Sequence, residues 1–139
     1  MGFLDKVNNL FSGSGSDSGS KRESLWTPIL SNEDIDAVLL ASNERVQVVF
    51  KHSGSCSISF FAKLNIDKAH LWEGKEADLY IIDVINSRPV SLEFAERVRV
   101  RHESPQLFII KDGEVVWSDS HANVNSANIK RVFAEMAAS

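Results

Sequence analysis

From Trp26 to the C-terminus, apolar segments typical of β-strands alternate with segments of helical periodicity. Strands are expected at residues 26–30, 46–50 and 79–85, and each is followed by a helical pattern. A repeated strand–helix–strand order requires parallel strands joined by right-handed crossovers, which place helices on both faces of a sheet. The order therefore predicts an α/β protein.

Local signals indicate where the helices begin. Ser31 is a candidate N-cap because an acidic residue follows three positions later, as in a capping box. A second helix is expected from about Ser57. Pro89 is well placed in the first turn of a third helix, where its missing N–H costs nothing. Asn125 or Ser126 is expected to cap the last helix.

Near its end the chain no longer alternates between strand and helix patterns. Two β-rich segments, 106–110 and 114–117, are joined at Asp112-Gly113, which is a strong signal for a tight hairpin. The hairpin adds antiparallel strands to the parallel part of the sheet. The predicted order is therefore βαβαβαββα, with a central mixed β-sheet and helices on both faces.

The composition shifts sharply near position 24. Residues 12–20 contain only Ser, Gly and one Asp, which is typical of a flexible linker. Residues 1–11 place apolar side chains at roughly helical spacing: Phe3, Leu4, Val7, Leu10 and Phe11. This segment is either a short amphipathic helix, which docks on its own domain, a second copy or a surface, or a disordered tail. Two regions are expected: an N-terminal tail (1–24) and a folded domain (25–139).

Length and charge exclude several classes of function. The 139 residues suffice for one domain with a hydrophobic core. A formal net charge of −4 gives no basic surface for nucleic acid. No apolar stretch is long enough to span a membrane, and the N-terminus lacks the pattern of a signal peptide. A monomer in the cytoplasm is the expected state.

Cys56 is the only cysteine, so no internal disulfide can form. It follows a buried strand and a short polar turn, and therefore lies at or near a helix N-terminus. Free backbone N–H groups and the helix dipole favour an anion there, so this thiol should ionise more easily than a free one. Ser59, one helical turn later, could donate a hydrogen bond to the thiolate or could solvate the helix instead. The alternative for Cys56 is a small buried hydrophobic residue.

Ser104-Pro105 directly precedes the strand at 106–110. In the predicted order this turn could lie beside the loop that carries Cys56, with a cis peptide bond or as an ordinary trans turn. His52 and His102 are either structural or close enough to stabilise a thiolate. The spacing of the four histidines and Cys56 does not fit a metal site, so no zinc or iron is expected.

Three motifs resemble the monothiol bacilliredoxins, the thioredoxin-like proteins of the bacillithiol system. They are Lys-His-Ser-x-x-Cys within residues 50–59, His-Glu-Ser-Pro-Gln within 101–106, and the segment 112–117 with Ser-His beyond it. The resemblance extends from about Leu25 to the C-terminus. It implies a thioredoxin-like fold for the whole folded part of the chain.

The resemblance also implies roles for individual residues. Cys56 would be the redox nucleophile, and Pro105 would be a cis proline that faces it. Ser104 would flank the site where an extended thiol substrate pairs with the backbone. Ser55 and His52 are expected to contribute to substrate binding. Ser57 is expected to do so too, and it replaces the proline that the family usually has after the cysteine.

The chemistry implied is thiol–disulfide exchange. Cys56 would take a low-molecular-weight thiol, bacillithiol, from mixed disulfides on client proteins. Bacillithiol would be a co-substrate, and no cofactor is expected. Because the chain has no second cysteine, an external thiol or another redoxin must regenerate Cys56. The alternatives are a thioredoxin-like binding module without redox turnover, or a thiol-based redox sensor.

Overall fold

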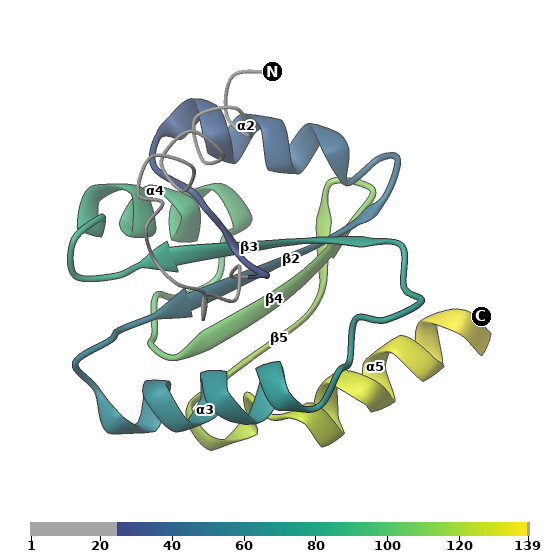
Figure 1. Ribbon diagram of the computed structural model, residues 1–139. Coiled ribbons are helices and arrows are strands. Elements are labelled where there is room, and N and C mark those ends of the chain that lie inside the picture. Colours follow the sequence, from purple (N-terminus) through teal and green to yellow (C-terminus); the bar gives the residue numbers. More distant parts are fainter. Residues whose placement is uncertain (1–24, 139) are drawn as a thin grey trace, which may run out of the picture.

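The computed structural model describes residues 25–138 (Figure 1). The predicted linker and amphipathic segment, 1–24, lie outside the described residues. The elements follow the predicted βαβαβαββα order: β1 (Thr27–Pro28), α2 (Asn32–Ala41), β2 (Val46–His52), α3 (Ser57–Lys68), β3 (Ala77–Asp83), α4 (Arg88–Val98), β4 (Gln106–Lys111), β5 (Glu114–Ser120), the 3-10 helix η1 (His121–Asn123) and α5 (Ser126–Ala138).

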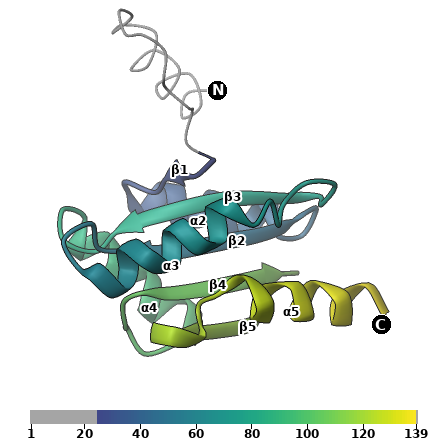
Figure 2. The ribbon, with the colours of Figure 1, turned by 60° about the horizontal axis from the view of Figure 1, so that its bottom comes forward.

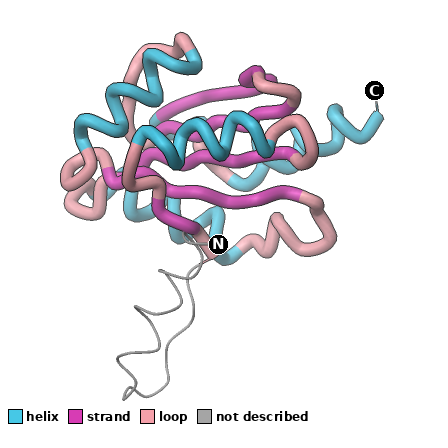
Figure 3. The backbone as a smooth tube through the Cα atoms, turned by 90° about the horizontal axis from the view of Figure 1, so that it is seen from above, coloured by secondary structure: helices cyan, strands magenta, loops and turns pink. Residues whose placement is uncertain are grey.

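The strands form one mixed sheet in the order β1-β3-β2-β4-β5. β1 and β2 pair with β3 in parallel, whereas β4 is antiparallel to both β2 and β5. α2 and α4 lie on one face of the sheet, and α3 and α5 lie on the other (Figures 2 and 3). This arrangement confirms the predicted α/β class and the mixed sheet.

Alternation along the central strands divides the core into two layers. Phe50 and Leu107 are fully buried on the face covered by α3 and α5. Val49 and Phe108 are fully buried on the face covered by α2 and α4. Successive side chains of a strand point to opposite faces, so a strand buried on both sides must be apolar throughout. This explains why β2 and β4 are mostly apolar along their buried lengths.

The predicted caps and turns are present in the structure. The backbone N–H of Asp34 donates to the Ser31 hydroxyl at 3.2 Å, which confirms Ser31 as an N-cap. At the hairpin, Asp112 and Gly113 both have positive φ angles, 53° and 79°. Two left-handed residues in succession are what a tight hairpin requires, and Asp-Gly adopts them readily.

Strand boundaries differ from the prediction where pairing decides them. β2 continues two residues further, to His52, because His52 pairs with Asp83 of β3. β3 ends at Asp83 rather than at Ile85. The Asp83 carboxylate accepts hydrogen bonds from the backbone N–H groups of Ile85, at 3.0 Å, and Asn86, at 2.9 Å. These bonds turn the chain out of the sheet.

Trp26 fastens the start of the described chain to α3. Its indole Nε1 donates to Asp67 Oδ1 at 2.8 Å. Its ring packs against Phe50 and Trp72, with centroid separations of 5.5 and 5.7 Å. No helix within residues 25–138 is long and apolar enough to cross a membrane.

We expect Trp26→Phe to lower the free energy of unfolding by about 2 kcal/mol through the lost hydrogen bond, because this bond goes to a charged carboxylate. Trp72→Phe is the matched control, since its Nε1 is buried without a hydrogen-bond partner among residues 25–138. Urea denaturation of both variants measures the difference. Equal losses in the two variants would show that the Trp26–Asp67 bond contributes nothing.

Candidate functional site

Strand register brings the two predicted loops to the same end of the sheet. Lys51 pairs with Gln106 of β4, and His52 pairs with Asp83 of β3. The loop that leaves β2 toward Cys56 and the loop that enters β4 through Pro105 therefore belong to adjacent strands at one edge. The backbone N–H of His121 in η1 donates to the Pro105 carbonyl at 2.9 Å, and η1 packs beside α3. The Pro105 turn is thus linked to the helix that begins at the cysteine.

Cys56 occupies the N-cap position of α3. Its backbone is extended, its N–H donates to the Ser53 carbonyl at 3.2 Å, and its own carbonyl accepts from the N–H of Phe60 at 2.9 Å. The thiol is free and partly exposed to solvent. Its flanking residues Ser55 and Ser57 are exposed. A partly exposed sulfur at a helix N-terminus is accessible to a second sulfur atom, whereas a fully buried one would not be.

Ser59 lies beneath the loop that carries Cys56. The side chain is fully buried, and its oxygen accepts from the backbone N–H of Ser53 at 3.0 Å. The same oxygen lies 2.7 Å from His52 Nδ1. With the His52 proton on Nε2, the Ser59 hydroxyl donates to Nδ1. The one hydroxyl proton is then used for His52, and Ser59 serves to tie the start of α3 to the end of β2.

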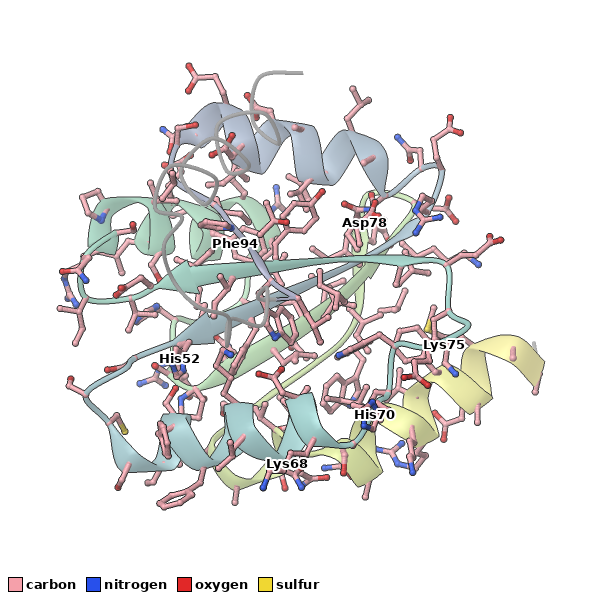
Figure 4. The ribbon with its side chains drawn as sticks, in the orientation of Figure 1. His52, Lys68, His70, Lys75, Asp78 and Phe94 are labelled. Atoms are coloured by element: carbon pink, nitrogen blue, oxygen red, sulfur yellow. The ribbon has the colours of Figure 1, made fainter. Side chains whose placement is uncertain are left out.

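Burial lowers the pKa of His52, and the nearby Lys63 cation lowers it further, although Asp83 and Asp67 raise it. His52 is therefore neutral at pH 7, as its role of acceptor requires. It lies at the end of β2, on the side of the sheet that carries α3 (Figure 4). Its ring also packs against Phe50, with centroids 5.5 Å apart. The structure thus gives His52 a structural contact beside the cysteine loop.

Lys51 is fully buried on the opposite face of the sheet. Its Nζ lies 3.0 Å from His102 Nδ1, and it stands over the rings of Phe94 and Phe108 at 5.8 and 5.7 Å. Burial lowers the pKa of Lys51 to about 8. Burial also lowers the pKa of His102, as do the Lys51 and Arg88 cations, while Glu103 raises it. At pH 7 a neutral His102 therefore accepts a hydrogen bond from the Lys51 ammonium.

Sequence reasoning did not identify Lys51 as part of this site. A strand ending at residue 50 leaves Lys51 in a polar turn, where a lysine needs no explanation. A strand that continued to His52 would place the Lys51 ammonium in the core between the sheet and its helices. A lysine inside a buried strand is rare unless it has a partner, which is the signal that was available.

Side-chain hydrogen bonds of Gln106 and Glu103 hold the loop before β4 in place. The Gln106 amide donates to the Arg101 carbonyl at 2.9 Å, and its oxygen accepts from the N–H of Glu103 at 3.0 Å. The Glu103 carboxylate accepts from the hydroxyl of Ser120. The Ser104–Pro105 peptide bond is cis, and Pro105 is buried. The Ser104 hydroxyl oxygen is buried and has no hydrogen-bond partner among residues 25–138.

Other features of the described chain lie apart from the cysteine. Within residues 25–138 no group of three His, Cys, Asp or Glu side chains could hold a metal ion. A cavity of about 730 Å³ lies at the opposite end of the sheet, where Val46 begins β2 and Lys111 ends β4, and Phe133 of α5 forms part of its wall. Cys56 is not among the residues that line this cavity.

Comparison with known proteins agrees with this arrangement. The family described as monothiol bacilliredoxin BrxC matches residues 27–129. A solved structure, described as a candidate oxidoreductase with a thioredoxin fold, is 29% identical, with a TM-score of 0.69; the match covers 78% of this chain and 94% of that one. Thioredoxin from Trypanosoma brucei brucei is 14% identical, with a TM-score of 0.65 over 88% of this chain and 100% of its own. Thioredoxin from Fasciola hepatica is 18% identical, with a TM-score of 0.62 over 78% and 96%.

We expect Ser59→Ala to lower the free energy of unfolding by about 1–3 kcal/mol, because it leaves the buried Ser53 N–H and His52 without their partner. Ser57→Ala is the matched control, since Ser57 is exposed at the start of the same helix and should change stability by less than about 0.5 kcal/mol. Thermal or urea denaturation measures both. Comparable effects in the two variants would contradict the structural role of Ser59.

The lowered pKa of Lys51 makes stability depend on pH. The pKa is 10.5 in the unfolded chain and about 8 in the folded one, so between these values the unfolded chain binds more protons. Stability therefore rises with pH in this window. We expect this contribution to be about 2 kcal/mol between pH 7.5 and 9.5.

Replacing the lysine tests this directly. In Lys51→Met the contribution is lost, and the rise of the free energy of unfolding over the same pH range should be smaller by about that amount. Lys68→Met, which removes an exposed lysine of α3, should keep the slope of the parent protein. Urea titrations at several pH values measure the slopes. A slope in Lys51→Met equal to that of the parent would mean that Lys51 is not buried as an ammonium.

Proposed function

Because the chain belongs to the monothiol bacilliredoxin family, we propose that its one cysteine removes a low-molecular-weight thiol from mixed disulfides on client proteins. The family and the thioredoxin fold assign the chain a thiol redox function. The finer assignment, with bacillithiol as the thiol and Cys56 as the nucleophile, is our proposal. The observation that carries it is a free, partly exposed sulfur at the N-cap of α3.

The reaction consists of two exchanges. In the first, the Cys56 thiolate attacks the bacillithiol sulfur of the mixed disulfide, so the bond between client and bacillithiol breaks as a bond between Cys56 and bacillithiol forms. The client leaves as a thiolate and takes a proton from water. In the second, an external thiolate attacks the bacillithiol sulfur of the Cys56 disulfide, so a disulfide between the external thiol and bacillithiol forms as Cys56 leaves as a thiolate. The external thiol is the reductant, because the chain has no second cysteine.

The backbone around Cys56 supports the first exchange. The first N–H groups of a helix lack partners within the helix, and together with the dipole they stabilise a negative sulfur. The thiolate is the form of cysteine that attacks a disulfide. The Cys56 N–H is itself held by the Ser53 carbonyl, so the sulfur starts from a fixed backbone position.

The remaining site residues hold the loops in place or flank the sulfur at the surface. Ser59 and Pro105 hold the two loops, one beneath the start of α3 and one at the entrance of β4. Ser55 and Ser57 flank the sulfur at the surface, where they can contact the bound thiol. Ser104 offers backbone groups to an extended substrate. His52 acts through its contact with Ser59.

Mass spectrometry of the intact protein tests the proposal. After exposure to oxidised bacillithiol, we expect a covalent adduct at Cys56 that a reductant removes. After exposure to glutathione disulfide at the same concentration, we expect at least tenfold less adduct. Cys56→Ser should give no adduct, and it should not release bacillithiol from a modified client protein.

Three outcomes would contradict the proposal in different ways. Equal adducts from both disulfides would reject bacillithiol as the preferred partner but keep the redox role of Cys56. Release of bacillithiol by Cys56→Ser would reject the mechanism itself. If the native protein forms no adduct with either disulfide, the chain is a binding module and not a redox catalyst.

A further inference from the structure

The outer face of α3 carries an apolar patch, here called the α3 patch. It consists of Ile58, Phe60, Phe61 and Leu64, with exposed fractions of 56%, 50%, 63% and 38%. The other large exposed apolar residues of the described chain are spread over several different elements. Four such side chains within seven residues of one helix are therefore a cluster, and clusters of this kind mark binding surfaces.

The α3 patch is not explained by the packing of the domain. Ser59 and Ile66 form the buried side of α3, and Ala62 also packs against the core, whereas the four patch residues do not belong to it. Phe60 and Phe61 contact each other, with centroids 5.3 Å apart. A helix on the surface of a domain usually shows polar residues on its outer side. This outer side begins two residues after Cys56.

The described chain starts beside the same helix. Trp26 donates to Asp67 of α3 at 2.8 Å, and Lys63 also contacts Asp67, at 2.7 Å. Asp67 is three residues from Leu64 and seven from Phe60, so all three lie on one side of the helix. The preceding residue, Leu25, is 54% exposed. The described chain therefore begins at the flank of the α3 patch.

The sequence outside the described residues contains a segment that is apolar like the α3 patch. Residues 1–11 place five apolar side chains on one side of a helical pattern: Phe3, Leu4, Val7, Leu10 and Phe11. Thirteen residues, rich in Ser and Gly, separate this segment from Leu25. A flexible linker of this length spans roughly 20 Å on average. Along α3, the distance from Asp67 to Phe60 is only about 10 Å, so the segment can reach the patch.

We propose that residues 1–11 dock as an amphipathic helix on the α3 patch of the same molecule. An isolated helix of this length is only marginally stable in water. Packing of its apolar side against the α3 patch would supply the missing stability. A short tether gives the segment an effective concentration near the millimolar range, which favours its own domain over a second copy.

Amide chemical shifts of the full-length, ¹⁵N-labelled protein test this inference independently of the redox function. Leu4→Glu/Leu10→Glu places two charges on the apolar side of the segment. We expect the amide signals of residues 58–64 to shift in this variant. Asn8→Glu/Asn9→Glu places the same two charges on the polar side and should leave these signals in place. In the reciprocal experiment, Phe61→Ser should shift the signals of residues 3–11.

Several results would overturn the inference. One is equal responses of α3, or none, to the two double substitutions. Shifts confined to Leu71 and Phe133, at the cavity near α5, would place the segment elsewhere. Shifts of residues 58–64 that change on tenfold dilution would assign the α3 patch to a second copy. Because Phe61 is exposed, Phe61→Ser is expected to fold, so a missing response of residues 3–11 would also count against docking.

Discussion

The pairing of β2 with β3 on one side and β4 on the other is the constraint on which the site depends. β2 runs parallel to β3 and antiparallel to β4, so its C-terminal end meets the C-terminal end of β3 and the N-terminal end of β4. Three chain segments that are far apart in the sequence therefore meet at one edge. One of them carries Cys56, and another carries Pro105. η1 contacts both α3 and the Pro105 carbonyl, so it links the helix that begins at Cys56 to the Pro105 turn.

Buried polar contacts hold this edge in place on both faces of the sheet. Ser59 joins His52 and the Ser53 N–H on the face that carries α3, and Lys51 meets His102 on the face that carries α4. Each contact ties a residue at the end of β2 to another segment at this edge. Such groups are costly to bury without partners, so they specify geometry more than they add stability. We infer that the end of β2 is built to fix the loops around Cys56.

Sequence reasoning predicted most of the fold because the fold depends on local signals. The Asp112-Gly113 hairpin, the Ser31 cap and the position of Pro89 each act within a few residues. Strand ends depend on distant partners, which is why the last two residues of β2 were missed, and Lys51 with them. The side of α3 that packs inward also depends on tertiary contacts, so the outward position of Phe61 could not be read from spacing.

The central claim is that Cys56 takes the small thiol and frees the client. A time course of intact masses tests it, with equal amounts of this protein and a client carrying one bacillithiol on one cysteine. The account predicts that one bacillithiol moves to Cys56 as an equal amount of client is released with a free thiol. Accumulation of a disulfide between Cys56 and the client would contradict it, since the client sulfur would then be the one attacked.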